Sequence, residues 1–150
     1  MGLFSFIKNA GAKLFGKKAE SNEEAKLDRI IALKEAVLGM GFYIKDFDVD
    51  IEGDNVTVTG EVDSQELKEK VILTLGNVEG VATVTDNMVV VVPEPESVFY
   101  EVKSGDSLSK IAKMHYGDAM KYNIIFEANK PMLTDPDLIY PGQVLRIPAI

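Results

Sequence analysis

A chain of 150 residues has the length of one ordinary domain or of two small ones, and 46% apolar with 27% charged residues is typical of a folded globular protein. The absence of cysteine excludes disulfides, thiol catalysis and cysteine-ligated metal centres. The net charge of −8 is uneven, since residues 1–19 hold four lysines and no acid whereas residues 20–92 hold sixteen acids against six bases. Nucleic-acid binding requires clustered Lys and Arg, so we expect no nucleic-acid partner.

The first predicted element is a short amphipathic helix over residues 3–15, where apolar residues recur near helical spacing with Lys8 and Lys13 between them. Residues 1–19 comprise this helix and a connector. A secretory signal places its positive charge before a continuous apolar stretch, whereas these lysines lie within and after the apolar residues, so we expect a cytoplasmic protein. Four lysines are few for stable attachment to a lipid surface. We therefore expect the helix to dock on the protein's own core.

Residues 20–92 have the pattern of a small mixed domain that begins with a helix. Ser21 and Glu24 form a capping box, and a helical apolar period follows until Gly39. This spacing predicts a helix packed on one face.

Two alternating stretches follow that helix. Residues 45–52 alternate apolar and acidic side chains, and the alternation resumes at residues 56–62 after a glycine-containing turn, which predicts a hairpin. A second helix ends at Gly76, and residues 81–92 supply a third strand. The predicted order is helix, strand, strand, helix, strand.

Residues 93–98 contain Pro-Glu-Pro-Glu, which predicts a short, stiff, charged linker, because proline fixes φ and cannot continue a sheet ladder. We place a domain boundary there and assign residues 99–150 to a second domain. Its predicted elements are a strand at 98–103, helices at 107–115 and 119–129, and a strand at 143–147. The fold class expected is α+β, with two small domains.

The C-terminal segment has the most specific motifs of the chain. They are FYEVKSGDSL at 99–108, Ile-Ala at 111–112, Tyr-Gly at 116–117, Ile125, Asn129 and IYPGQVLRIP at 139–148. From end to end this segment resembles a LysM domain. The resemblance implies a strand, helix, helix, strand fold, in agreement with the pattern of the residues.

The middle segment has looser motifs, VTGEV at 58–62 and VEGVATV at 78–84, with a helix between them. It resembles a BON domain. A BON domain joined directly to a LysM domain, behind a Met-Gly-Leu-Phe start, resembles the small bacterial cytoplasmic potassium-binding proteins. That resemblance spans all 150 residues and implies a potassium sensor.

The residue inventory does not favour an enzyme. The single histidine, His115, and the absence of cysteine leave no set of nitrogen or sulfur ligands for a metal site, and no nucleophile elbow or phosphate-binding loop occurs. We expect no catalytic activity. His115 lies near a predicted helix end, where we expect a structural residue or a partner of the helix dipole.

Four alternating carboxylates raise the alternative of calcium. They are Asp46, Asp48, Asp50 and Glu52. An EF-hand loop starting at Asp46 would need a glycine and a glutamate where Ile51 and Thr57 stand, so that signature is absent. The pattern predicts instead a solvated face of a strand.

Potassium is a large, weakly hydrated ion, and the filters that prefer it replace its water with main-chain carbonyls. Helix ends and glycine turns free such carbonyls, which points to residues 10–12 and 76–81. If the N-terminal helix docks on the core, these two segments could face one another. The family resemblance implies carbonyl ligands at Ile7, Ala10, Ala12, Gly76, Val78 and Val81. Because a smaller ion loses more hydration energy and contracts a ring of carbonyls further, we expect Rb⁺ and Cs⁺, but not Na⁺, to substitute for K⁺. An ordinary helix cap and turn is the alternative.

The LysM resemblance also implies a shallow groove for N-acetylglucosamine chains. Its matching positions are Gly105, Asp106, Ser107, Leu108, Leu138, Ile139 and Tyr140. The alternative is that Asp106 caps a helix, Leu108 and Ile139 belong to the core, and the LysM domain clasps the BON domain. Peptidoglycan binding and association of the BON domain with lipid surfaces stay open as rival functions, whereas our main expectation is a monomer that binds potassium without a membrane.

Overall fold

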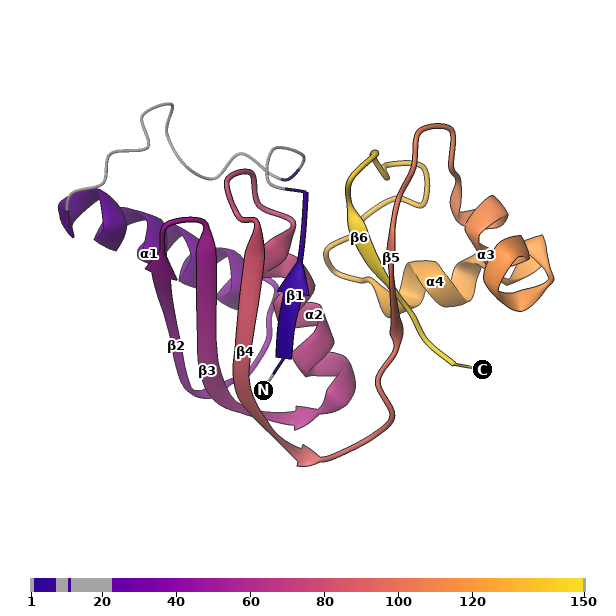
Figure 1. Ribbon diagram of the computed structural model, residues 1–150. Coiled ribbons are helices and arrows are strands. Elements are labelled where there is room, and N and C mark those ends of the chain that lie inside the picture. The colour runs from indigo at the N-terminus through magenta and orange to yellow at the C-terminus, as the bar shows by residue number, and fades with distance from the viewer. Residues whose placement is uncertain (1, 8–10, 12–22, 150) are drawn as a thin grey trace.

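The structure is a computed structural model that describes residues 2–7, 11 and 23–149 (Figure 1). Its first half contains α1 (Glu23–Leu38), β2 (Lys45–Glu52), β3 (Asn55–Ser64), α2 (Gln65–Gly76) and β4 (Thr83–Val92). The predicted order of helix, strand, strand, helix, strand is confirmed. Strands β2 and β3 form the expected antiparallel hairpin, and β3 pairs with β4 in parallel. Both helices cover one face of this sheet (Figure 1).

The N-terminal residues differ from the prediction. Residues Gly2–Ser5 form a strand, β1, which pairs antiparallel with β4 at the edge of a sheet ordered β1-β4-β3-β2. Phe4 and Phe6 turn toward the core while Leu3 is exposed, which is the period of a strand and not of a helix. A short isolated helix is marginal, whereas the free edge of β4 offers backbone partners. The predicted helix at 3–15 is therefore wrong for residues 3–5, and most of its remainder lies outside the described residues.

The core of the first half lies between the sheet and the two helices. Helix α1 buries Leu33 and Val37 and exposes Leu27 and Ile31, so its buried face is narrower than the apolar pattern indicated. Helix α2 begins at the N-cap Ser64, whose side chain accepts a hydrogen bond from the Leu67 N–H at 3.1 Å. Its end at Gly76 is confirmed.

The second half contains β5 (Val98–Glu101), α3 (Leu108–Tyr116), a 3₁₀ turn η1 (Ala119–Lys121), α4 (Tyr122–Ala128) and β6 (Val144–Ile147). The predicted strand, helix, helix, strand order is confirmed, and β5 pairs antiparallel with β6. Ser107, not Asp106, is the N-cap of α3. Among the described residues, no helix is long and apolar enough to cross a membrane.

The two halves lie side by side, with β6 next to α2 (Figure 1). Val144 of β6 belongs to the hydrophobic core of the first half, and the Phe4 and Phe99 rings lie 5.1 Å apart between their centroids. Residues 93–97, which connect β4 to β5, form neither helix nor strand. The expected contact between the BON-like and LysM-like parts is thus present and partly apolar.

Candidate functional site

The turn that follows α2 is the first component of the candidate site. The Asn77 N–H donates to the Leu73 carbonyl at 3.0 Å, and the Val81 N–H donates to the Val78 carbonyl at 3.1 Å. Gly80 has a φ of 99°, which a residue with a side chain rarely adopts. Residues 76–81 therefore form a compact reversal whose carbonyls lie at a helix end.

The N-terminal segment, of which the structure describes residues 2–7 and 11, lies against this turn through Phe6 and Gly11. The Phe6 N–H donates to the Ala82 carbonyl at 2.8 Å, and a Cβ added to Gly76 would lie 2.1 Å from the Phe6 ring. A Cβ added to Gly11 would lie 2.3 Å from the carbonyl carbon of Asn77. Gly11 thus permits a close approach of two backbones, and Gly76 leaves room for the Phe6 ring against its own backbone. The N-terminal segment and the 76–81 turn face each other, although residues 2–5 are a strand.

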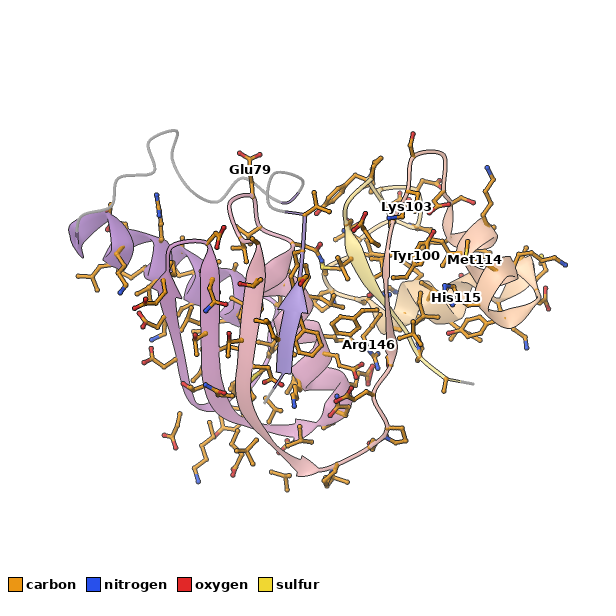
Figure 2. All side chains as sticks on the ribbon, in the orientation of Figure 1. Glu79, Tyr100, Lys103, Met114, His115 and Arg146 are labelled. Atoms are coloured by element: carbon orange, nitrogen blue, oxygen red, sulfur yellow. The ribbon has the colours of Figure 1, made fainter. Side chains whose placement is uncertain are left out.

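The predicted ligand residues fall on these two segments. Within residues 2–7, 11 and 23–149, no hydrogen bond reaches the carbonyl oxygens of Ile7, Gly76 or Val81. The Val78 carbonyl accepts from Val81, and both of these valine side chains are buried. The two further predicted ligands, Ala10 and Ala12, lie outside the described residues. The arrangement offers neutral main-chain oxygens among apolar side chains, and Glu79 points outward from the tip of the turn (Figure 2).

Gly11 and Asn77 lie in the two segments predicted from the sequence, but the contacts that they make, and the part played by Phe6, were not predicted. Phe6 lies within the helix predicted at residues 3–15, and its contact with Gly76 depends on a segment seventy positions away. Asn77 follows the glycine that ends α2. An asparagine at a helix end often forms hydrogen bonds between its side chain and a backbone, and this was the signal that the sequence offered. Gly11 between two alanines offered only the general signal that glycine permits close backbone approach.

The acidic face of β2 is exposed, as predicted. Asp48 lies 3.2 Å from Lys34 and Asp50 lies 3.5 Å from Lys26, so two of its carboxylates face lysines of α1. The hydrogen bond from the Val49 N–H, followed by that from Lys34, holds the pKa of Asp48 below its usual value. Among the described residues, no three His, Cys, Asp or Glu side chains are grouped to hold a metal ion.

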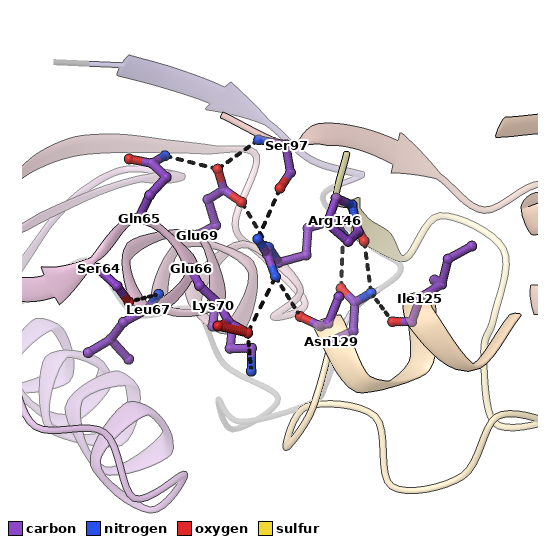
Figure 3. A network of polar contacts seen from close by, with 12 residues as sticks. Ser64, Gln65, Glu66, Leu67, Glu69, Lys70, Ser97, Ile125, Asn129 and Arg146 are labelled. Atoms are coloured by element: carbon purple, nitrogen blue, oxygen red, sulfur yellow. Dashed lines mark hydrogen bonds and ion pairs between the residues drawn. The ribbon is translucent and has the colours of Figure 1, made fainter. Parts of the chain in front are cut away.

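A polar network joins the two halves (Figure 3). The Arg146 Nε of β6 donates to the Glu69 carboxylate of α2 at 2.8 Å, and Glu69 also accepts from Gln65 and from the Ser97 N–H, each at 2.9 Å. Glu69 and Arg146 are 2% and 7% exposed. Burial alone would raise the pKa of Glu69, but these hydrogen bonds outweigh it and lower the pKa.

The LysM-like loops place the predicted glycan-binding residues in different environments. Leu108 is buried and Ile139 packs against the same hydrophobic cluster, so these two side chains belong to the core. Leu138 is 64% exposed and Tyr140 is half-buried, with its pKa raised by burial. Gly105 adopts a φ of 86° in the turn before α3, and Ser107 is occupied as the N-cap.

Asp106 holds that turn together instead of capping α3. It accepts hydrogen bonds from the Tyr100 hydroxyl at 2.6 Å and from the Lys103 N–H at 2.8 Å. The bond to Asp106 raises the pKa of Tyr100 to about 12 and lowers that of Asp106. Tyr100 meets the exposed His115 edge-on, with ring centroids 5.3 Å apart, so His115 is a surface residue at the end of α3 (Figure 2).

Comparison with known proteins agrees with both resemblances. Residues 32–92 match the BON domain and residues 100–148 match the LysM domain. The chain is 48% identical over 149 residues to the potassium binding protein Kbp of Escherichia coli O6:H1, with 99% of each chain covered. The chain belongs to the Kbp family. Over 50 residues, the chain is also 58% identical to an uncharacterized protein of Deinococcus radiodurans, a match that covers 33% of this chain and 19% of that one.

The similarity to Kbp extends beyond the two domain matches. The BON match begins at residue 32, so it omits β1 and Gly11, whereas the alignment with Kbp covers 99% of the chain. The N-terminal segment that faces the 76–81 turn is therefore a feature of a Kbp-like chain and is not part of the BON match.

Proposed function

We propose that this protein binds a potassium ion through main-chain carbonyls of the N-terminal segment and of residues 76–81. The observation that carries the proposal is the backbone approach of Gly11 to Asn77, which sets two carbonyl-bearing segments against each other. The name of the 48% identical relative, potassium binding protein Kbp, supports the choice of ion. The proposed ligands are the carbonyl oxygens of Ile7, Ala10, Ala12, Gly76, Val78 and Val81.

The donor set fits a monovalent ion better than a divalent one. Calcium is held in proteins by carboxylates together with carbonyls, and the only acidic side chain of the turn, Glu79, points outward (Figure 2). Neutral carbonyl dipoles replace the weak hydration shell of potassium at a lower cost than that of a smaller or doubly charged ion.

Ion titration of the whole protein tests this proposal. We expect K⁺, Rb⁺ and Cs⁺ to bind more tightly than Na⁺, because a smaller ion loses more hydration free energy and draws the carbonyls further inward. Calorimetry in a choline buffer would measure each affinity. Equal responses to Na⁺ and K⁺, or tighter binding of Ca²⁺ that Asp48→Asn and Asp50→Asn reverse, would overturn the carbonyl site.

We also propose that the protein is a cytoplasmic sensor that becomes more compact when the ion binds. Without a cation, the carbonyls of the two facing segments repel one another, so the ion favours their closed arrangement and shifts the population by RT ln(1 + [L]/Kd). The linker at 93–98 would pass this change to the LysM domain. We expect potassium, compared with choline at equal ionic strength, to protect amides of residues 3–15 and 74–82 from hydrogen exchange and to reduce the radius of gyration. Unchanged exchange and radius would reject the coupling.

A second candidate function, binding of N-acetylglucosamine chains, rests on the LysM match at residues 100–148. The exposed Leu138 and the half-buried Tyr140 are the side chains best placed for it. A pull-down on insoluble peptidoglycan, run beside the potassium titration, separates the two functions. If the protein is retained on peptidoglycan, Leu138→Ala weakens that retention, and the protein does not respond to potassium, glycan binding is the favoured function.

A further inference from the structure

The free edge of β6 is closed by two asparagine side chains. On one edge β6 pairs with β5. On the other edge the Val144 N–H and carbonyl each bond to the Asn77 side chain at 2.8 Å, and those of Arg146 bond to Asn129 at 2.8 and 2.9 Å. An asparagine amide carries one carbonyl and one NH₂ group, so each side chain substitutes for a peptide group of a neighbouring strand.

The two asparagines come from different parts of the molecule. Asn129 follows α4 and lies in the same half as β6, whereas Asn77 lies in the turn of the candidate site. Asn77 is only 7% exposed, and its amide nitrogen also lies 3.5 Å from the Met132 sulfur. Asn77 therefore connects the edge of a LysM strand to the 76–81 turn through two hydrogen bonds that water does not reach.

The backbone of Asn77 is held as firmly as its side chain. Its N–H bonds to Leu73 at the end of α2, and its carbonyl carbon faces Gly11 at the distance of a close backbone contact. Its neighbours Gly76 and Val78 are two of the proposed ligands. Rotation of the Gly76–Asn77 peptide, which carries the Gly76 carbonyl, would move Asn77 and strain its side-chain bonds to Val144.

We infer that Asn77 is a positioning residue that sets the spacing of the carbonyls and thereby the preference for K⁺ over Na⁺. This inference rests on the proposed function. A ring of carbonyls that can contract accommodates a smaller ion, whereas a ring whose backbone is anchored to a second domain resists contraction. Asn77 lies between Gly76 and Val78 and anchors this part of the ring to β6.

The decisive experiment measures the ratio of K⁺ to Na⁺ affinity in the full-length protein by calorimetry in choline buffer. Asn77→Asp keeps the size of the side chain but removes the donor to the Val144 carbonyl, and Asn77→Ala removes both bonds. We expect each variant to bind K⁺ about tenfold more weakly and to lose less Na⁺ affinity, so that the ratio falls. Circular dichroism melts would show that the variants are folded.

Glu69→Gln is the matched control, because it weakens the same domain contact through Arg146 without touching the 76–81 turn. It should leave the K⁺ to Na⁺ ratio unchanged even if both affinities fall. An unchanged ratio in both Asn77 variants would overturn the inference, as would an equal fall in Glu69→Gln. Failure of the wild-type protein to bind K⁺ would instead overturn the proposed function itself.

A measurement on the wild-type protein keeps the inference testable if the variants do not fold. In NMR spectra, the side-chain NH₂ signals of Asn77 should shift on addition of potassium chloride but not of choline chloride. Those of Asn129, which makes the same type of pair with Arg146, should stay in place. Equal shifts of both side chains, or none at Asn77, would contradict the positioning role.

Discussion

Replacing Gly11 with alanine is expected to abolish the response to potassium while leaving the two domains folded. The added Cβ would lie 2.3 Å from the Asn77 carbonyl carbon, far inside a van der Waals contact, and the obstructing atoms are backbone that cannot rotate aside. The N-terminal segment must therefore move away from the 76–81 turn, and the proposed carbonyl ring loses the ligands of one segment. Calorimetric titration with potassium chloride would measure the loss of heat.

Ser5→Ala is the matched control, because Ser5 lies on the exposed face of β1 and its substitution leaves the register with Thr83 intact. Deletion of residues 2–13 should abolish binding as well, but it also removes β1 and the buried Phe6, whose burial contributes about 1.5–3 kcal/mol. A melting curve is thus needed beside its titration. If the deletion variant is folded and binds potassium as tightly as the full chain does, the ion site lies elsewhere.

Local patterns predicted most of the elements, because the physics that forms them is local. The alternation at residues 45–52 matches β2 at both ends, and the glycine that ends α2 was read correctly at Gly76. Strand β1 was not predicted, because a stretch of a few apolar residues is compatible with both a helix and a strand. Pairing with the edge of β4, which lies far away in the sequence, selects the strand. A few residues at the end of a chain contain no local information about a pairing partner some eighty positions away.

The candidate site was predictable in part for a related reason. Carbonyl ligands have no side-chain signature, so the sequence could offer only places where helices end and glycines turn. Such a place exists at residues 76–81, whereas the contacts that hold it, from Phe6, Gly11 and the pair of Asn77 with Val144, join segments far apart in the chain. The ion pair of Glu69 and Arg146 also joins residues 77 positions apart, and no periodic pattern in the sequence predicts that these two side chains meet.

That pair is the basis of the second large effect we expect. Replacing Glu69 with alanine should destabilise the protein by about 3–5 kcal/mol, because it removes the buried charge partner of Arg146 and leaves the exposed Glu66 carboxylate 3.7 Å away. It also removes the acceptor of the Ser97 N–H, which weakens the attachment of the linker to α2. Urea denaturation followed by circular dichroism would measure the change in the free energy of unfolding.

Glu66→Ala is the matched control on the same helix. Glu66 is exposed and lies 3.7 Å from Arg146 and 3.3 Å from Lys70, so its loss should change the free energy of unfolding by no more than about 1 kcal/mol. Equal effects of the two substitutions would show that the buried pair does not hold the halves together.

Acidification should reproduce the effect of Glu69→Ala in the wild-type protein. The pKa of Glu69 is lowered in the folded state, so its contribution to stability is complete above its unfolded pKa, about 4.3, and is lost as the pH falls through the lower folded value. The difference in unfolding free energy between wild type and Glu69→Ala should therefore be constant near neutral pH and shrink below about pH 4. A difference that persists undiminished at the lowest pH would mean that the ionised carboxylate of Glu69 does not supply the stability, because protonation would then leave the contact with Arg146 and Ser97 intact.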